Sequence, residues 1–187
     1  MSDTKTALLD SAERAARRFG FDGFSYADLA QDVGIRKASI HYHFPSKASL
    51  SVAMMRRYRE TFVGVCAQIE SAEETGAGRL RALISQYESA LENGTCLCLC
   101  VALSNSRDSL CAETLDQMAQ FRAAMMEWIG GVFAQGQQDG SIAGVVDAAK
   151  EAAAMLPLLE GAQLAARVSG EIAVFRAATS LLQDRLS

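Results

Sequence analysis

The chain has 187 residues, of which 50% are hydrophobic and 21% charged, with only two prolines. This composition predicts one or two folded domains with a substantial apolar core, and it excludes an intrinsically disordered chain. The formal net charge of −4, taken as an average, argues against a nucleic-acid-binding protein. The average conceals a division, because residues 1–60 carry ten Lys and Arg against seven Asp and Glu, a net of +3, whereas residues 61–187 carry a net of −7.

The sequence contains no export or membrane signal that we can identify. The polar residues Ser2–Lys5 precede no apolar signal segment, and no run of about 20 apolar residues could span a bilayer. We therefore expect a cytoplasmic protein with no membrane partner. The five cysteines are an odd number and include the cluster Cys96, Cys98 and Cys100, which is unlike the disulfide framework of a small secreted domain and favours reduced thiols.

Apolar residues recur with the 3.6-residue period of a helix along almost the whole chain. The first predicted helix covers residues 4–19 and ends before Gly20. Ser25 and Asp28 have the spacing of a capping box, which predicts that a second helix starts here. That helix is expected to end at Gly34, where a residue free to adopt positive φ lets the chain turn sharply.

A short third helix follows, with Ile40 and Phe44 on its inner side, and Pro45 stops it. Ser46 is placed to cap a longer fourth helix over residues 46–70.

Further helices are predicted over about residues 80–91 and 112–138, from the capping residue Asp147 to Ala166, and finally up to about Leu186. A cysteine-rich apolar stretch over residues 95–103 separates the first two. Because the sequence lacks the alternating pattern of β-strands, the chain is predicted to be all-α with about nine helices.

Residues 25–44 have the layout of a helix, a tight glycine turn and a second short helix, which is typical of a helix-turn-helix unit. Leu29, Ala30 and Val33 belong to its apolar inner side. Its outer side carries side chains that can bind phosphates, reach base edges or contact a thymine methyl group, and Lys47 begins the next helix. These outer residues are Lys37, Ser39, His41, Tyr42 and His43.

Residues 24–47 resemble the DNA-binding signature of the tetracycline-repressor (TetR) family in their joint pattern, FSYADLAQDVGIRKASIHYHFPSK, and the resemblance covers about residues 5–60. It implies a homodimeric repressor in which a DNA-binding head, residues 1–47, precedes a helical ligand-binding and dimerisation domain, residues 48–187. One departure is His41, where the family more often has Tyr, so no base preference carries over. The implied DNA-binding residues are Ser25, Tyr26, Arg36, Lys37, Ala38, Ser39, His41, Tyr42, His43 and Lys47.

The second domain shows no constellation of catalytic residues. Residues 79–187 have no Gly-rich phosphate loop and no paired carboxylates, and both histidines lie in the head, so we expect no enzymatic activity, no cofactor and no His-rich metal site. Methionines and aromatic residues at helical spacing indicate core, and in this fold the core also lines the effector cavity, which favours an apolar, mid-sized effector. The candidate ligand-binding residues are Phe62, Cys98, Met118, Phe121, Met125, Trp128 and Leu159.

The cysteine cluster leaves three hypotheses open: buried or pocket-lining thiols, a sensor of oxidants or electrophiles, and a metal site. If the stretch is helical, Cys96 and Cys100 share a face while Cys98 lies about 200° away, so the three thiolates converge only on an extended backbone. The alternative function is accordingly a thiol-based regulator that uses Cys96, Cys98 and Cys100.

The last two predicted helices are rich in small residues, for example Gly161, Ala162 and Ala177. Small residues allow close helix approach, so we expect a four-helix dimer interface, with Pro157 kinking the first of the two helices; ordinary packing within one chain is the alternative. The sequence thus predicts a repressor that binds a palindromic double-stranded DNA operator and is released by a small-molecule effector. An enzyme and a purely structural or partner-binding helical protein are the competing classes.

Overall fold

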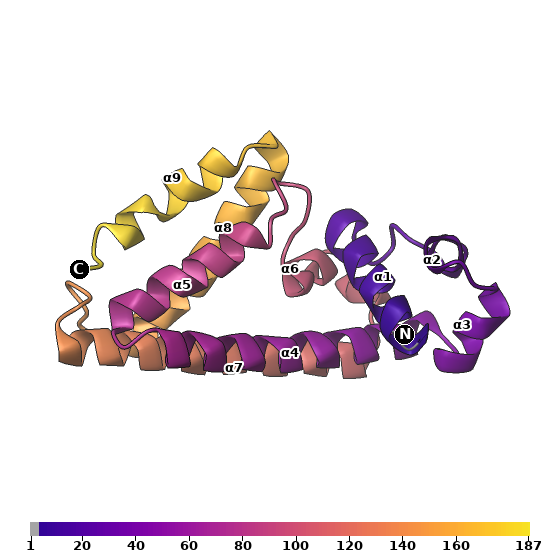
Figure 1. Cartoon of the computed structure of the whole chain (residues 1–187), viewed down its shortest axis with the longest axis horizontal. Coiled ribbons are helices and arrows are strands. Elements are labelled where there is room, and N and C mark those ends of the chain that lie inside the picture. Colours follow the sequence, from indigo (N-terminus) through magenta and orange to yellow (C-terminus); the bar gives the residue numbers. More distant parts are fainter. Residues whose placement is uncertain (1–3) are drawn as a thin grey trace. The chain divides into compact units, whose positions relative to one another are not determined.

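The computed structural model describes residues 4–187, and this part of the chain forms nine α-helices and one short 3₁₀ turn (Figure 1). The all-α prediction is confirmed, and no helix within the described residues is long and apolar enough to cross a membrane. The helices are α1 (Thr4–Phe19), α2 (Tyr26–Val33), α3 (Lys37–His43), α4 (Lys47–Ala72), α5 (Gly76–Ser89), α6 (Leu99–Ser104), α7 (Ala112–Asp139), α8 (Ala148–Ser169) and α9 (Ile172–Gln183), with the 3₁₀ turn at Arg107–Ser109.

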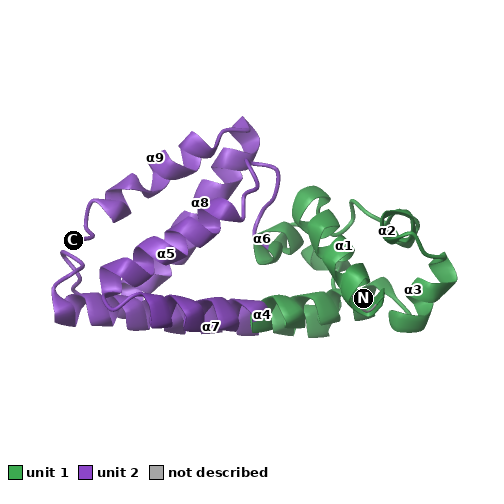
Figure 2. Cartoon of the chain, viewed as in Figure 1, with its two compact units in different colours: residues 1–60, 99–119 green, residues 61–98, 120–187 purple. Residues whose placement is uncertain are grey.

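The chain divides into two compact units (Figure 2). Unit 1 contains the residues up to Glu60 together with Leu99–Ala119, and unit 2 contains Thr61–Cys98 together with Gln120–Ser187. Helices α4 and α7 each contribute residues to both units. The functional division expected from the sequence, residues 1–47 and 48–187, is drawn at a different point and stays a prediction.

Unit 1 is built on the apolar side of α1, where Leu8, Ala12 and Ala16 are fully buried. Helices α2 and α6 pack against α1, and α3 packs against α2. Ile40 of α3 and Leu50 of α4 are also fully buried in this unit. Removing such aliphatic side chains from water is the main stabilisation of a small helical head.

The predicted helix ends in unit 1 are confirmed by their hydrogen bonds. The Ser25 side chain accepts from the Asp28 N–H while Asp28 accepts from the Ser25 N–H, so both halves of the capping box of α2 are present. Gly34 ends α2 with φ 72°, a left-handed conformation that glycine adopts without a steric penalty. Ser46 caps α4, because its Oγ accepts from the Ser49 N–H at 3.1 Å.

Unit 2 has its core around Phe133, Phe175 and Leu159, all fully buried. Helices α8 and α9 pack on each other, and both contact α5. Where α5 begins, a Cβ on Gly76 would lie 2.4 Å from the Gly136 Cα of α7, so this crossing requires glycine.

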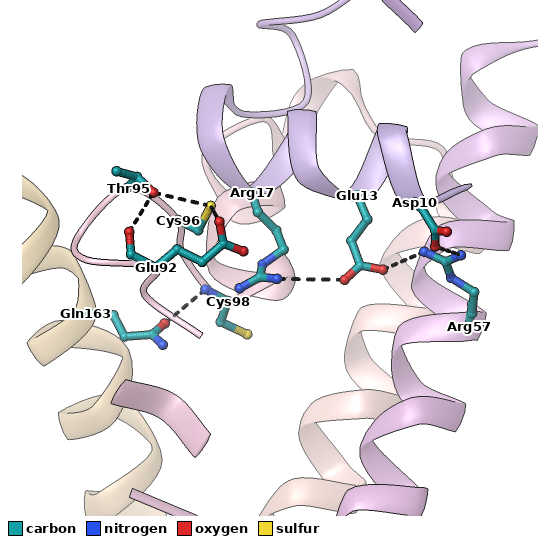
Figure 3. Close-up of polar contacts among 9 residues, drawn as sticks. All are labelled: Asp10, Glu13, Arg17, Arg57, Glu92, Thr95, Cys96, Cys98 and Gln163. Atoms are coloured by element: carbon teal, nitrogen blue, oxygen red, sulfur yellow. Dashed lines mark hydrogen bonds and ion pairs between the residues drawn. The ribbon is translucent and has the colours of Figure 1, made fainter. Parts of the chain in front are cut away.

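One buried polar side chain links three segments of unit 2. Gln163 of α8 is fully buried, and its Oε1 accepts from the Cys98 N–H at 2.9 Å (Figure 3). Its Nε2 donates to the Tyr87 carbonyl at 2.9 Å. Both ends of the amide are therefore satisfied, which is the usual condition for burying such a group.

Two expectations about helix extent need correction. The last helix ends at Gln183 rather than near Leu186, because the following residues hydrogen-bond to the segment after α7: the Ala143 N–H donates to the Arg185 carbonyl, and the Ser187 N–H to the Ser141 carbonyl, both at 2.8 Å. In the cysteine-rich stretch only residues from Leu99 onward are helical, so the helical geometry considered for Cys96 and Cys98 does not apply. Helix α8 continues through Pro157 as one element.

Candidate nucleic-acid interface

Helix α3 is held on its inner side and exposed on its outer side. Ile40 and Phe44 are buried against the head, which fixes how α3 lies on it. Tyr42 is 84% exposed, so this aromatic side chain is not a core residue, and its ring meets the His43 ring edge-on at 5.1 Å between centroids. Of the residues predicted to face DNA, those exposed to solvent are Ser25, Arg36, Lys37, Ala38, Ser39, His41 and Tyr42.

A surface hollow of about 470 Å³ runs beside this exposed side of α3. Two of its lining residues, Thr4 and Ile35, were not among the predicted site residues. Thr4 lies at the start of α1, and its place beside α3 is a tertiary relation that no motif encodes. The hollow is lined by Thr4, Ile35, Ala38, Ser39, Tyr42 and His43.

Tyr26 has a different environment from the exposed residues. It is buried, its hydroxyl donates to the Phe44 carbonyl at 3.0 Å, and its ring lies edge-on to the His41 ring at 5.0 Å between centroids. Burial raises the pKa of Tyr26 to about 12. Its side chain therefore supports α3 from inside the head, by holding the end of that helix and the ring of His41.

Ser25 is exposed, and its side chain is engaged in the cap of α2. Its Oγ donates to Asp28 Oδ2 at 2.7 Å, and its N–H donates to the same oxygen at 2.7 Å. These hydrogen bonds from the Ser25 side chain and backbone lower the pKa of Asp28 below its ordinary value. The capping box thus orients the first turn of α2, whose N–H groups are the kind of donor that binds phosphate.

Lys47, the first residue of α4, points back into the head. Its Nζ donates to the carbonyl oxygens of Phe21 and Phe24, at 2.6 Å for Phe24, and lies 4.6 Å and 4.2 Å from the centres of their rings. Desolvation by burial lowers the pKa of Lys47, against the opposing effect of the Asp22 and Asp28 charges.

Three acidic side chains of the head are paired with arginines of α1 and α4. Arg57 of α4 binds Asp10 and Glu13 of α1 at 2.7 Å and 2.8 Å (Figure 3), and Arg14 binds Asp32 at 2.9 Å. From residue 33 to residue 59 the sequence has no Asp or Glu. The exposed side of α3 therefore lies in a carboxylate-free segment, which favours a polyanionic partner.

The candidate ligand-binding residues are distributed over both units. Met118 is buried in unit 1. In unit 2, the Phe62 and Phe121 rings meet at 5.3 Å between centroids, and the Tyr87 hydroxyl donates to Met125 Sδ at 3.3 Å. The remaining three lie in unit 2 as follows: Cys98 and Leu159 are buried, and Trp128 is half-buried with its Nε1 donating to Glu70 Oε1 at 2.8 Å.

The three cysteines of the cluster are buried. The Cys96 thiol donates to Glu92 Oε2 at 3.4 Å (Figure 3). Elsewhere in unit 2, desolvation and then the Glu70 charge raise the pKa of the Cys66 thiol to about 12. Among residues 4–187, no three His, Cys, Asp or Glu side chains are grouped so that they could hold a metal ion.

A short helix that follows a glycine turn, is anchored by buried residues and exposes a polar, carboxylate-free side defines a helix-turn-helix DNA-binding regulator. Residues 8–54 match the model of the family described as bacterial regulatory proteins, tetR family. The crystal structure of a TetR-family transcriptional regulator from Agrobacterium tumefaciens is similar with a TM-score of 0.92 and 30% identity, over 98% of this chain and 97% of that one. The chain therefore belongs to the TetR family of transcriptional regulators.

Two curated relatives are similar over different lengths. The chain is 27% identical to the HTH-type transcriptional regulator TtgR of Pseudomonas putida, over 85% of this chain and 78% of the relative. Over 46 residues, 25% of each chain, it is 41% identical to the biofilm operon icaADBC HTH-type negative transcriptional regulator IcaR of Staphylococcus aureus (strain Newman).

Proposed function

We propose that this TetR-family regulator is a homodimeric repressor that binds a palindromic operator through the exposed side of α3 and is released by a small-molecule effector. The observation that carries the proposal is the outer side of α3, which is exposed, polar and aromatic, and lies in a segment without carboxylates. The similarity of the head to a negative regulator supports repression. We propose no catalytic step and no cofactor for the protein.

The roles of the residues follow from their chemistry and exposure. Arg36 and Lys37, at the start of α3, are suited to phosphates. Ser25 and Tyr26 contribute through the first turn of α2, whose N–H groups can meet a phosphate, although the Tyr26 side chain itself is buried. The remaining exposed or half-buried residues of α3 can contact base edges and thymine methyl groups. These are Ala38, Ser39, His41, Tyr42 and His43.

The proposed dimer interface is the exposed face of α8 and α9. Apolar side chains on these helices remain accessible in the single chain: Val168 is 89% exposed and Leu181 80% exposed, with Leu158 and Leu164 at about two fifths. Packing within the chain accounts for buried residues such as Ala162 and Ala166, but it leaves these side chains in water. A second copy related by a two-fold axis would cover them and would pair two heads for a palindrome.

An apolar effector in unit 2 fits the aromatic and sulfur-containing interior around Phe62, Phe121 and Met125. Since α4 contributes residues to both units, a shift of α4 on ligand binding would change the placement of the heads and mismatch the spacing of the half-sites.

The thiol-based alternative has less support. Cys96, Cys98 and Cys100 are buried, and the Cys96 thiol is engaged in a hydrogen bond to Glu92, so the three sulfur atoms are shielded from reagents in solution. Mass spectrometry after mild peroxide or quinone treatment separates the two proposals: modification of these cysteines together with loss of DNA binding would favour the sensor.

The test of DNA binding starts from a duplex that the protein selects out of a randomised pool. We expect a gel shift with this duplex. When a panel of apolar and electrophilic compounds is added one at a time, the compounds of the effector's class should abolish the shift. Lys37→Ala should weaken binding to all sequences and lower the salt slope by about one unit. Arg81→Ala, which removes an exposed positive charge from α5, outside the head and outside α8 and α9, is the matched control and should leave both unchanged. Failure to select any duplex would contradict the proposal.

A further inference from the structure

The segment that follows α9 closes back onto the connection between α7 and α8 (Figure 1). Leu186 forms an antiparallel bridge with Ile142, and a backbone hydrogen bond of 2.8 Å lies on either side of this bridge. Ile142 is itself fixed, because its side chain fills the space above Gly136 of α7, where a Cβ would lie 2.3 Å from it. Residues 184–187, which we call the clasp, are therefore attached to the end of α7.

Arg185 attaches the clasp to α8. Its Nη1 and Nη2 donate to the two carboxylate oxygens of Glu151 at 2.9 Å and 2.7 Å, and its Nε donates to the Ala143 carbonyl at 3.0 Å. Only 30% of the Arg185 side chain and 21% of the Glu151 side chain are exposed. A bidentate, partly buried pair holds both partners in one geometry, which an exposed ion pair with a single contact does not. The hydrogen bonds from Arg185 also lower the pKa of Glu151, so the pair is ionised at neutral pH.

Helices α8 and α9 form a hairpin that is open at one end. Residues 170–171 join the two helices, which pack on each other. Glu151 lies in the first turn of α8, and Arg185 follows the last residue of α9. The ion pair therefore joins the two ends of the hairpin that the connecting turn leaves separate.

The closure of this hairpin bears on the proposed dimer interface. Leu158 and Leu181, which a second copy would cover, lie within two helical turns of Glu151 and Arg185. Helix α9 has 12 residues and is therefore about 18 Å long. A splay of about 10° at the connecting turn would move its far end by about 3 Å, which is enough to break side-chain contacts between two copies.

We propose that residues 184–187 clasp the α8–α9 hairpin and that Arg185 is a positioning residue for dimerisation, because it ties the end of α9 to Glu151 of α8. This inference rests on the proposed dimer interface and adds to it two side chains that act from within one chain.

The first experiment measures the clasp itself, by hydrogen exchange resolved to single amides. The Ala143 amide donates to the Arg185 carbonyl, so we expect it to exchange at least about tenfold faster in Arg185→Ala and in Glu151→Ala than in the wild type. The Gly76 amide, which donates to Asp139 in the same unit, is the internal reference and should exchange equally in all three proteins. Unchanged exchange at Ala143 overturns the clasp, whatever the state of association.

The second experiment measures association by sedimentation velocity. A dimer needs the closed hairpin in both copies, so we expect each single variant to raise the dimer dissociation constant about tenfold. The double variant should raise it no further, because both substitutions remove the same ion pair. Arg81→Ala removes an exposed arginine of α5 that donates to the Leu186 carbonyl and leaves the ion pair intact, so this matched control should associate like the wild type.

The outcomes separate the clasp from the proposed dimer. Wild-type dissociation constants in the single variants, or losses that multiply to about 100-fold in the double variant, overturn the positioning role. Arg185→Lys keeps the charge and can donate to one oxygen of Glu151, so it should recover part of the association that Arg185→Ala loses; no recovery also counts against the role. A wild type that stays monomeric contradicts the proposed function, and with it the positioning role, whereas the exchange at Ala143 still decides whether the clasp exists.

Discussion

The polar contacts that define the helix-turn-helix motif and the contacts that join distant segments of unit 2 link residues at different separations along the chain. In the helix-turn-helix part of unit 1 the capping box joins Ser25 and Asp28, three residues apart, and Tyr26 and Phe44 are 18 apart. In unit 2 the Gln163 amide reaches residues 65 and 76 positions away, and Arg81 donates to the Leu186 carbonyl across 105 positions.

This difference decides how much of the motif and of the packing in unit 2 is visible in the sequence, and how each responds to substitution. Contacts between residues that are close in the sequence leave a recognisable residue pattern, and the loss of such a contact affects one helix end. Long-range contacts leave no local pattern, and losing one uncouples several segments at once. Substitutions at single polar or exposed positions in each unit test this difference.

The largest expected loss of stability comes from Gln163→Leu. The change removes the acceptor that Gln163 offers to the Cys98 N–H and the donor that it offers to the Tyr87 carbonyl, so we expect a loss of about 3 kcal/mol in the free energy of unfolding, measured by urea denaturation. Gln86→Leu, at an exposed position of α5, is the matched control and should change stability by no more than about 0.5 kcal/mol. Equal losses in the two variants would show that the three segments do not depend on Gln163.

Leu181→Glu tests the proposed interface of unit 2. A carboxylate on the exposed apolar face of α9 would have to be desolvated on dimerisation, so we expect the dimer dissociation constant to rise about 100-fold, which is about 2.7 kcal/mol. Sedimentation velocity over a range of concentrations measures it. Val146→Glu introduces the same charge at an 89% exposed position outside α8 and α9 and should leave the association unchanged. An unaltered dimer in Leu181→Glu would place the interface elsewhere.

Ser25→Ala removes the cap of α2 in unit 1. Losing this acceptor for the Asp28 N–H should cost about 1 kcal/mol of stability and weaken DNA binding, because the first turn of α2 is no longer fixed. Thermal unfolding and the gel shift measure the two effects. In Ser85→Ala the same atoms are removed from an exposed helical position of α5, where alanine is favoured, so no loss is expected.

The smallest effect is the pH dependence of the same cap. Hydrogen bonds from Ser25 lower the pKa of Asp28 in the folded protein below its value in the unfolded chain. The unfolded chain therefore takes up the proton first on acidification, so the stabilisation is present above the unfolded pKa and is lost as the pH falls through the folded pKa. The Tm difference between wild type and Asp28→Asn should shrink from pH 7 to pH 3. A Tm difference that does not change with pH would show that the Asp28→Asn effect comes from the shape of the side chain rather than from its charge.

The parts of the fold that were predicted from the sequence are those with local signals. Ser25, Gly34 and Asp147 mark helix ends through hydrogen bonds or backbone conformations within one turn, and the structure has all three. The end of the last helix was misplaced because residues 185–187 bond to residues 141–143, which lie more than 40 positions away.

The same limit applies to the candidate site. The residues proposed to face DNA were recognised from one continuous segment, but their division into exposed and inward-facing side chains was not. Tyr26 and Lys47 have polar ends that reach Phe44, Phe21 and Phe24. Nothing in the spacing of the motif distinguishes a tyrosine or lysine that faces solvent from one that closes onto a carbonyl, since this depends on how α2, α3 and α4 pack.

The absence of carboxylates from residue 33 to residue 59 has a consequence for which substitutions this regulator can accept. Asp and Asn have nearly the same size and differ in charge, as do Glu and Gln. In a saturation library scored for repression, the amide variants of the exposed positions on α3 should survive far more often than the matching acids. The absence of negative charge in this segment would then be conserved, while its individual residues, and with them the operator sequences, could change.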